Sequence, residues 1–204
     1  MNSEFWDNRY KENDYAYGEE ANEFIKEVLP SLSKGKILFP ADGEGRNSVF
    51  AASLGWDVYA FDISNQGKIK AEQLAIKNKV NIQYEVNDIL NVNYKPEFFD
   101  ALVFVFVHFP DKKNKEFYRF LNQFLKPGGT VIIEVFNKQH IEYNSINPQV
   151  GGPSKIDMLF SEDELLEIYQ EFDIKLCESI VYELAEGGYH KGKGSVIRAI
   201  FQKK

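Results

Sequence analysis

The stretch GKILFPADGEGRNSVFAASLGWDVYAFDIS, residues 35–64, decides the fold of this chain. It predicts a strand, a turn, a helix and a second strand, over residues 36–39, 42–45, 47–54 and 57–61. This is half of a nucleotide-binding β-α-β unit, because Gly43 and Gly45 let the backbone approach a ligand and the helix start offers free N–H groups. Asp62 ends the second strand, where a carboxylate accepts hydrogen bonds from ribose hydroxyls. The stretch therefore predicts a site for a nucleotide-containing ligand.

Outward from this stretch, the chain continues to alternate helices and strands. Apolar spacing and terminal signals predict helices over 19–29, 66–78, 111–125 and 161–171, and strands over 81–86, 99–106 and 130–136. Two more strand-like runs, 172–184 and 195–202, are joined by the glycine-rich loop 185–194, which predicts an antiparallel hairpin. The expected fold class is α/β: a Rossmann-like, seven-stranded, mostly parallel sheet with a C-terminal antiparallel hairpin and helices on both faces.

Two segments lack a regular pattern. Residues 1–18 are charged and aromatic without a clear period, and residues 137–160 contain Asn147-Pro148 and Gly151-Gly152-Pro153. An irregular segment as long as the second is usually functional or mobile. We therefore expect one domain over 1–204, in which 1–18 forms an arm or lid and 137–160 lies on the substrate side of the site.

Composition excludes several classes of function. The formal net charge of −7 over 204 residues argues against a large contact surface for nucleic acid or anionic membrane. The single cysteine, Cys177, excludes an intramolecular disulfide and a cysteine-based zinc site. The polar start has no apolar signal segment, and the longest apolar run, 101–109, is too short to span a bilayer. We expect a cytoplasmic protein without a membrane or nucleic-acid partner, and the sequence leaves its oligomeric state open.

Five features in chain order resemble a large enzyme superfamily, the class I S-adenosylmethionine-dependent methyltransferases. They are the turn Asp42-Gly43-Glu44-Gly45, Asp62 ending the second strand, Asn87-Asp88-Ile89 ending the third, the FLKPGG turn over 124–129, and the terminal hairpin. Each feature alone is weak, but the ordered set extends over essentially the whole chain. The resemblance implies a methyltransferase with S-adenosylmethionine as its cofactor and S-adenosylhomocysteine as the product formed from it.

Shorter motifs are similar to one branch, the small tellurite-resistance-like and thiol-methyltransferase-like proteins. They are Trp6-Asp7-x-Arg9-Tyr10, Tyr17-Gly18, GEGRN over 43–47, His108-Phe109-Pro110, Gly151-Gly152-Pro153, and Glu186-Gly187-x-x-His190-x-Gly192. The chain departs from the superfamily at Phe39 and Pro40, because many members have an acid and then a small residue there. The usual partner of the methionine amino group is thus missing, and Asp42 is its candidate replacement. The resemblance implies a small-molecule acceptor, such as a thiol or a metalloid oxyanion.

The resemblance also implies individual roles in cofactor binding. Asp62 binds the ribose, and Ile63 lies against the adenine. Asp88 accepts a hydrogen bond from the adenine amino group, beside the backbone N–H of Ile89. Gly43 and Gly45 of the turn bring the backbone against the methionine part, and Phe106 supports it. Arg9 or Arg46 binds its carboxylate. The aromatic faces of Trp6 and Tyr17 cover the sulfonium.

Three residues are candidates for orienting or deprotonating the acceptor. His108 follows the fourth strand, and the carboxyl ends of such strands face the crevice where ligands bind. Glu186 and His190 lie in the predicted hairpin loop. The histidines of the chain occur at no metal-ligand spacing, so we expect no metal.

Two other functions stay open from the sequence. The first is an NAD-dependent oxidoreductase, which begins with the same β-α-β unit. Ser48 stands where a dinucleotide fingerprint has its third glycine, and this residue and the terminal hairpin speak against it. The second is a non-catalytic protein that binds S-adenosylmethionine, which the departure at Phe39 and Pro40 leaves open.

Overall fold

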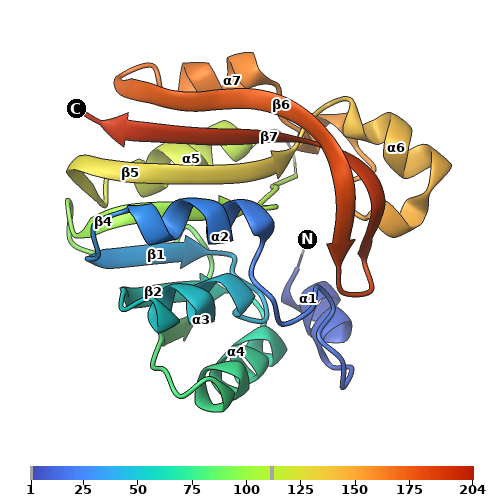
Figure 1. Cartoon of the computed structure of the whole chain (residues 1–204), viewed down its shortest axis with the longest axis horizontal. Coiled ribbons are helices and arrows are strands. Elements are labelled where there is room, and N and C mark those ends of the chain that lie inside the picture. Colours follow the sequence, from blue (N-terminus) through green and yellow to red (C-terminus); the bar gives the residue numbers. More distant parts are fainter. Residues whose placement is uncertain (1, 111–112) are drawn as a thin grey trace.

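The sheet has seven strands in the order β3-β2-β1-β4-β5-β7-β6 (Figure 1). The structure, a computed structural model, describes residues 2–110 and 113–204. Strands β1 to β5 pair in parallel, and β7 runs antiparallel to both β5 and β6. The predicted mostly parallel sheet with a C-terminal antiparallel hairpin is therefore confirmed.

Helices separate most of the consecutive strands, but β4 follows β3 without a helix between them. The strands are β1 (Lys36–Pro40), β2 (Asp57–Asp62), β3 (Gln83–Val86), β4 (Phe99–Val105), β5 (Leu125–Phe136), β6 (Phe172–Glu186) and β7 (His190–Lys203). The helices are α1 (Ser3–Tyr10), α2 (Glu23–Val28), α3 (Arg46–Ser53), α4 (Asn65–Lys77), α5 (Asn114–Asn122), α6 (His140–Ile146) and α7 (Glu162–Ile168). Three short 3-10 helices are η1 (Leu29–Ser31), η2 (Pro148–Val150) and η3 (Ile156–Met158).

Capping side chains set where two of the helices begin. The Asn22 side chain accepts two backbone N–H groups, so α2 begins at the next residue and not at the predicted residue 19. Ser161 and Glu164 form a capping box at the start of α7. The start predicted for α5, at 111, lies outside the described residues.

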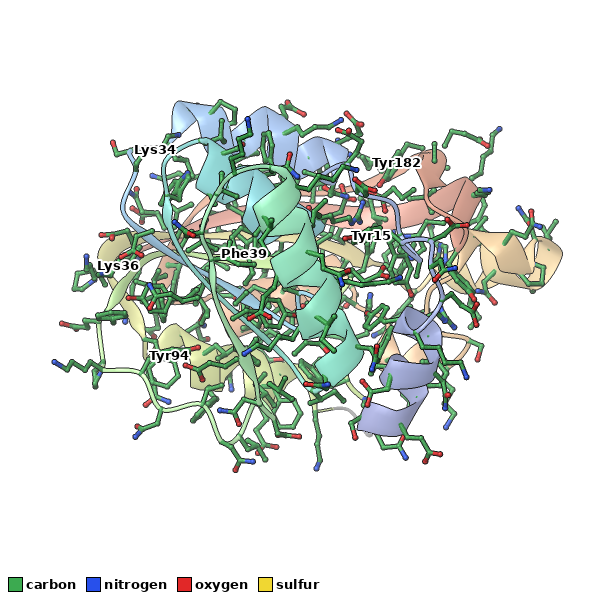
Figure 2. The ribbon with its side chains drawn as sticks, turned by 90° about the horizontal axis from the view of Figure 1, so that it is seen from below. Tyr15, Lys34, Lys36, Phe39, Tyr94 and Tyr182 are labelled. Atoms are coloured by element: carbon green, nitrogen blue, oxygen red, sulfur yellow. The ribbon has the colours of Figure 1, made fainter. Side chains whose placement is uncertain are left out.

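Apolar side chains bury both faces of the sheet. Residues of α2, α3 and α4, such as Phe24 and Ala71, share one buried cluster with β1 and β2. Residues of α5 and α7, such as Tyr118, share a second cluster with β4 and β5. In Figure 2 Lys36, at the start of β1, lies toward the left of the view, and Tyr15 lies to the right of the centre. The parallel strands run from the Lys36 side toward the Tyr15 side, so their carboxyl ends meet on that side.

The hairpin differs from the prediction at its turn. β6 extends to Glu186 and β7 begins at His190, so the turn is 187–189 and not 185–194. Glu186 and His190 are therefore cross-strand neighbours in the sheet. The prediction interpreted every glycine here as part of a loop, but Gly194 lies inside β7, where a Cβ would come within 2.5 Å of a Leu184 methyl group. This glycine allows close packing between strands.

Three other predicted segments are more regular than expected. β5 begins at Leu125, so the predicted turn over 126–129 is part of the strand, before a register shift against β4. Segment 137–160 contains α6, η2 and η3. Segment 1–18 contains α1, which Asn2 caps. Within the described residues, no helix has the length and apolar character needed to cross a membrane.

Candidate active site

A cavity of about 860 Å³ lies at the carboxyl ends of the parallel strands. Its walls come from the segments that follow β1 to β4, from segment 1–18, from the 137–160 segment and from the hairpin. All the site residues predicted from the sequence line this cavity, except Gly45 and Glu186. In Figure 1 the tip of the hairpin curves over this end of the sheet, toward α1.

Asp62 organises the cofactor side of the cavity. One carboxylate oxygen accepts the Gly43 N–H at 3.1 Å, and the other accepts the Ser64 N–H at 2.8 Å. Burial raises the pKa of Asp62 to about 6, although the hydrogen bonds from these N–H groups lower it. Each oxygen keeps further acceptor capacity, so the side chain can accept hydrogen bonds from hydroxyls while it fixes the turn.

The two glycines of the turn have different surroundings. Gly43 has φ +61°, lines the cavity and leaves no room for a Cβ, which would lie 2.7 Å from the Tyr10 hydroxyl. Gly45 has φ +84°, and a Cβ there would lie 2.5 Å from the Cβ of Ala71 in α4. Gly45 therefore allows α3 and α4 to pack closely, and its position does not match the predicted direct approach to the cofactor.

Asp42 is a half-buried acid with an unused oxygen. Its Oδ2 is inaccessible to solvent and has no hydrogen-bond partner among the described residues. Burial raises the pKa of this carboxyl to about 8, although a hydrogen bond from Ser48 opposes the shift. Leaving a buried acceptor unsatisfied is costly, typically about 1–3 kcal/mol, so this oxygen is a candidate partner for a donor on a ligand. Phe39, by contrast, is almost fully buried.

Asp88 and Ile89 follow β3 at the other end of the cofactor side. Asp88 is exposed, and its Oδ1 accepts the Leu90 N–H at 3.0 Å, which is a turn cap. Ile89 is buried. The Asp88 carboxylate thus has one oxygen in a local turn and a second oxygen for which the structure gives no hydrogen bond to a described residue.

The N-terminal arm, which we define as residues 2–18, is fixed over the cavity by polar contacts. Asp7 accepts hydrogen bonds from Ser64 Oγ and the Gln66 N–H, at the start of α4. Its pKa is lowered, chiefly by the Ser64 hydrogen bond. Glu44 of the glycine turn accepts the Ala16 N–H at 2.8 Å. The arm therefore holds Trp6, Arg9 and Tyr17 in the cavity wall.

The two arginines proposed for the methionine carboxylate differ in their partners. Arg46 is buried and forms an ion pair with Glu186 at 2.9 Å. Arg9 donates to the Tyr17 hydroxyl at 3.1 Å, and its guanidinium carbon lies 3.9 Å from the centre of the Tyr189 ring. The structure gives Arg9 no ion pair with another described residue, so Arg9 is the better candidate for an anionic group.

His108 lines the cavity with both ring nitrogens bound to backbone. Nε2 accepts the Phe136 N–H at 3.2 Å, which makes Nδ1 the donor to the Met158 carbonyl at 2.8 Å. Burial lowers the pKa of His108 to about 4. In this arrangement the ring joins β5 to η3 and has no free nitrogen for a proton from an acceptor. His140 is held in a similar way, between the Gly151 carbonyl and the Ser195 N–H.

His190 differs from these two histidines. Its Nδ1 lies 2.9 Å from Glu186 Oε2, and the ring packs against Phe106 and Tyr17, each with a centroid distance of 4.6 Å. Burial lowers the pKa of His190, and Glu186 opposes this shift. Burial alone would raise the pKa of Glu186, but Arg46 and His190 lower it to about 2. A carboxylate therefore faces Nδ1, which leaves Nε2 as the nitrogen that can accept a proton.

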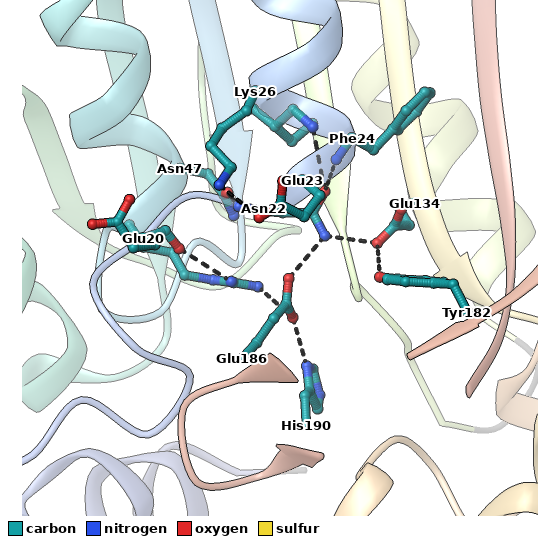
Figure 3. A network of polar contacts seen from close by, with 12 residues as sticks. Glu20, Asn22, Glu23, Phe24, Lys26, Asn47, Glu134, Tyr182, Glu186 and His190 are labelled. Carbon is teal, nitrogen blue, oxygen red and sulfur yellow. Dashed lines mark hydrogen bonds and ion pairs between the residues drawn. The ribbon is translucent and has the colours of Figure 1, made fainter. Parts of the chain in front are cut away.

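Glu186 lies behind His190 in a polar network that the sequence prediction missed. The network joins Glu186 to Asn22 and Glu134, and both of these are fully buried (Figure 3). A signal was available for Glu134, which is the one acid in the apolar run 131–136. An acid inside a buried strand requires polar partners. Among the described residues, no group of three or more acids, histidines or cysteines has the arrangement of a metal site.

Comparisons with known proteins support the resemblance to methyltransferases. The sequence model of the methyltransferase domain family, Methyltransf_25, matches residues 37–129. A comparison with curated protein sequences found no match. Residues 37–129 are therefore similar to this methyltransferase domain family, and the similarity supports the predicted enzyme class and its cofactor, S-adenosylmethionine.

Solved structures show the same fold at low sequence identity. The fold is similar to that of a protein solved in a study of the conversion of a disulfide bond into a thioacetal group during echinomycin biosynthesis. The TM-score is 0.76 at 15% identity, and the alignment covers 99% of this chain and 92% of that chain. It is similar to TehB from Haemophilus influenzae, with TM-score 0.71 and 19% identity, and the alignment covers 99% of this chain and 67% of TehB. It is also similar to magnesium protoporphyrin IX methyltransferase from Synechocystis PCC 6803 with bound S-adenosylhomocysteine, with TM-score 0.67, 16% identity, and 88% and 82% covered.

Proposed function

We propose that this protein binds S-adenosylmethionine in the cavity of about 860 Å³ and catalyses transfer of the cofactor's methyl group to a small-molecule acceptor. One observation carries the proposal. The Asp62 carboxylate with its glycine turn, the aromatic arm, and a histidine with an available nitrogen all line the same cavity. The fold and the methyltransferase domain support this assignment.

Four groups of the cavity fit the parts of the cofactor. The acceptor capacity that remains on Asp62 suits the ribose hydroxyls. The unpartnered Oδ2 of Asp42 suits the ammonium group of the methionine part. Arg9 suits its carboxylate, and the rings of Trp6 and Tyr17 suit the sulfonium, which an aromatic face stabilises by about 0.5–2 kcal/mol. We therefore propose Asp42 as the replacement for the acid that is missing at Phe39.

His190 is the proposed general base. When bound, S-adenosylmethionine supplies an electrophilic methyl carbon. A bond forms between the acceptor atom and this carbon as the carbon–sulfur bond breaks, and the sulfur keeps the electron pair. His190 Nε2 takes the proton that the acceptor loses, and Glu186 stabilises the resulting imidazolium through Nδ1–H. Orienting the two reactants contributes as well, by up to about 7–11 kcal/mol in favourable cases.

The walls near His190 favour a compact acceptor with an ionisable or anionic nucleophile. Phe106, Phe136 and Tyr17 surround the ring, with centroid distances of 4.6, 5.4 and 4.6 Å. Aromatic walls remove water from a nucleophile, and this makes a thiolate or an oxyanion more reactive. We propose a thiol or a metalloid oxyanion as the acceptor, in keeping with the short motifs that resemble the tellurite-resistance-like and thiol-methyltransferase-like branch.

A thermal unfolding experiment tests the cofactor assignment. S-adenosylmethionine and S-adenosylhomocysteine should each raise the Tm, and NAD should not. At about 100 times Kd, a ligand adds about 2.7 kcal/mol to the free energy of unfolding, which corresponds to roughly 5–10 °C for a chain of this size. Stabilisation by NAD alone would overturn the methyltransferase proposal in favour of an oxidoreductase.

Asp42→Asn tests the proposed anchor for the ammonium group. The pKa of Asp42 in the folded protein, about 8, is far above its ordinary value of 3.8. Its protonated form therefore stabilises the fold at low pH, and this stability is lost as the pH rises through 8. Without ligand, the Tm of the variant should fall less than that of the wild type between pH 6 and pH 9. Its affinity for S-adenosylmethionine should fall about tenfold or more, as one charge-assisted hydrogen bond implies.

Calorimetry of both proteins at several pH values separates these two effects. Asp62, with a pKa of about 6, is present in both proteins and titrates in a lower range, so the comparison isolates position 42. Unchanged affinity in the variant would show that another group binds the ammonium.

A further inference from the structure

The amide of Asn22 bridges two buried carboxylates (Figure 3). Its Nδ2 donates to Glu134 Oε1 at 2.6 Å and to Glu186 Oε1 at 3.0 Å. An amide nitrogen has two hydrogens, so each carboxylate takes one. Asn22 comes from the segment before α2, Glu134 from the middle of the sheet and Glu186 from the hairpin tip. One side chain thus joins three separate parts of the fold.

Every polar group of Asn22 is used. Its Oδ1 accepts the N–H groups of Phe24 and Ile25 and caps α2. Its backbone N–H donates to Asn47 Oδ1 at 2.9 Å. Asn22 is fully buried, so each of these bonds lies in a low-dielectric interior and fixes the amide plane.

Glu134 is a rigid support for this bridge. It is fully buried on β5, where Tyr182 donates to its Oε1 at 2.7 Å and Arg198 donates to its Oε2 at 2.6 Å. Arg198 is also its cross-strand neighbour on β7. Strand pairing and three side-chain donors therefore hold the Glu134 carboxylate in one orientation.

Asn22 supplies the hydrogen-bond donor for one of the two carboxylate oxygens of Glu186. Its Oε2 receives Arg46 and His190, each at 2.9 Å, whereas its Oε1 has Asn22 as its donor. The bridge therefore fixes the rotation of the carboxylate about its own axis. This rotation decides whether Oε2 faces His190 Nδ1.

We propose that Asn22 is a positioning residue for His190: its amide, supported by Glu134, orients Glu186 so that His190 carries its proton on Nδ1 and presents a bare Nε2 to the cavity. The inference rests on the proposed function for its link to methyl transfer. Asn22 touches neither reactant in this scheme and acts through Glu186.

The charges around the bridge explain why an amide is required. Glu134 pairs with Arg198, and Glu186 pairs with Arg46, so each carboxylate already has one cation. A neutral double donor joins the two pairs without adding charge. A carboxylate at position 22 would repel both acids, and a shorter hydroxyl has one proton to donate.

The charged and titratable groups that face His190 are Glu186, Arg46, Arg9, Tyr17, His108 and His140.

Asn22→Ser tests the proposal without loss of the helix cap. Serine caps helices about as well as asparagine, but it cannot donate to both carboxylates. The chain has three histidines, so their ring nitrogens can be followed individually by two-bond 1H–15N correlation NMR of labelled full-length protein. In the wild type, His190 should be the Nδ1–H tautomer at neutral pH. In the variant, a second population with the proton on Nε2 should appear.

Two internal controls and a control variant make this measurement specific. His108 and His140 are held by backbone partners, so their signals should not move. Asn78→Ser removes an amide that donates to the Leu74 carbonyl at the end of α4, and it should leave all three histidines unchanged. An unchanged His190 tautomer in Asn22→Ser would overturn the proposal.

Asn22→Asp is a second variant, with the opposite kind of change. It keeps the cap but adds a negative charge beside Glu186, which should raise the pKa of His190 in the NMR titration. An unaltered pKa would contradict the bridge. In a methyl-transfer assay, kcat of Asn22→Ser should fall about tenfold while the Kd of S-adenosylmethionine stays the same. The NMR experiment needs no acceptor, so an absence of methyl transfer by the wild type would contradict the proposed function and not this inference.

Discussion

His190→Ala should lower the rate of methyl transfer by about 10²–10⁴-fold, because this is the usual contribution of a well-placed general base. The ring nitrogen Nε2 is the available base in the cavity wall, since both ring nitrogens of His108 are bound to backbone. The affinity for S-adenosylmethionine should change little, because the groups proposed for the cofactor lie elsewhere in the cavity. Single-turnover kinetics and calorimetry measure the two effects separately.

The pH dependence and a graded variant sharpen this first prediction. Burial lowers the pKa of His190 from its ordinary value of 6.5, so the wild-type rate should fall when the pH drops below that value, as the base becomes protonated. Glu186→Gln keeps an oxygen that can face Nδ1 but loses the charge that stabilises the imidazolium, so its rate should lie between those of the wild type and His190→Ala. Wild-type turnover in His190→Ala would show that the acceptor reacts without this base.

Asp62→Ala should weaken the binding of S-adenosylmethionine about a hundredfold. Two charge-assisted hydrogen bonds to ribose hydroxyls, at about 1.5 kcal/mol each, account for this factor. The same substitution frees the Gly43 and Ser64 N–H groups, which loosens the turn on the cofactor side. Isothermal titration calorimetry measures the affinity, and circular dichroism checks that the fold is retained.

Asp57→Ala is the matched control for this second prediction. Asp57 begins the strand that Asp62 ends, so it lies at the opposite, amino end of β2, where it pairs with Lys36. Its removal should leave the affinity unchanged. Equal affinities of Asp62→Ala and the wild type would mean that the ribose is bound by other groups.

The sequence predicted the mostly parallel sheet and its terminal hairpin well because the succession of helices and strands along the chain follows from local signals. Apolar runs, glycine turns and the absence of a helix after residue 172 give parallel strands and then a hairpin. The exact residues of the hairpin turn could not be predicted from the sequence, because a glycine in a strand and a glycine in a loop look alike there. Gly194 packs against Leu184 and Gly45 packs against Ala71, and both contacts come from residues on other elements.

The lining of the cavity was predictable where a residue ends or follows a strand. Asp62 ends β2, and Asp42 and Phe106 follow β1 and β4, so all three reach the cavity. The partners of a buried polar group were not predictable in the same way. His108 and His190 look equally available in the sequence, and their difference comes from backbone groups of β5 and η3. The bridge at Asn22 joins positions 22, 134 and 186, and this separation leaves no local pattern.

The contact between the arm and the hairpin tip has a consequence for the timing of a catalytic cycle. Gly188 N–H donates to the Ala16 carbonyl at 2.9 Å, and Gly187 packs so closely on residues 16–18 that a Cβ would lie 2.4 Å from the same carbonyl oxygen. Both segments line the cavity, and in the proposed function the arm covers the cofactor and the hairpin covers the acceptor. Neither can swing away without disturbing the other, so departure of the spent cofactor and of the methylated product should share one opening motion. Turnover would then be limited by this motion when chemistry is fast, and the two products would leave as coupled events.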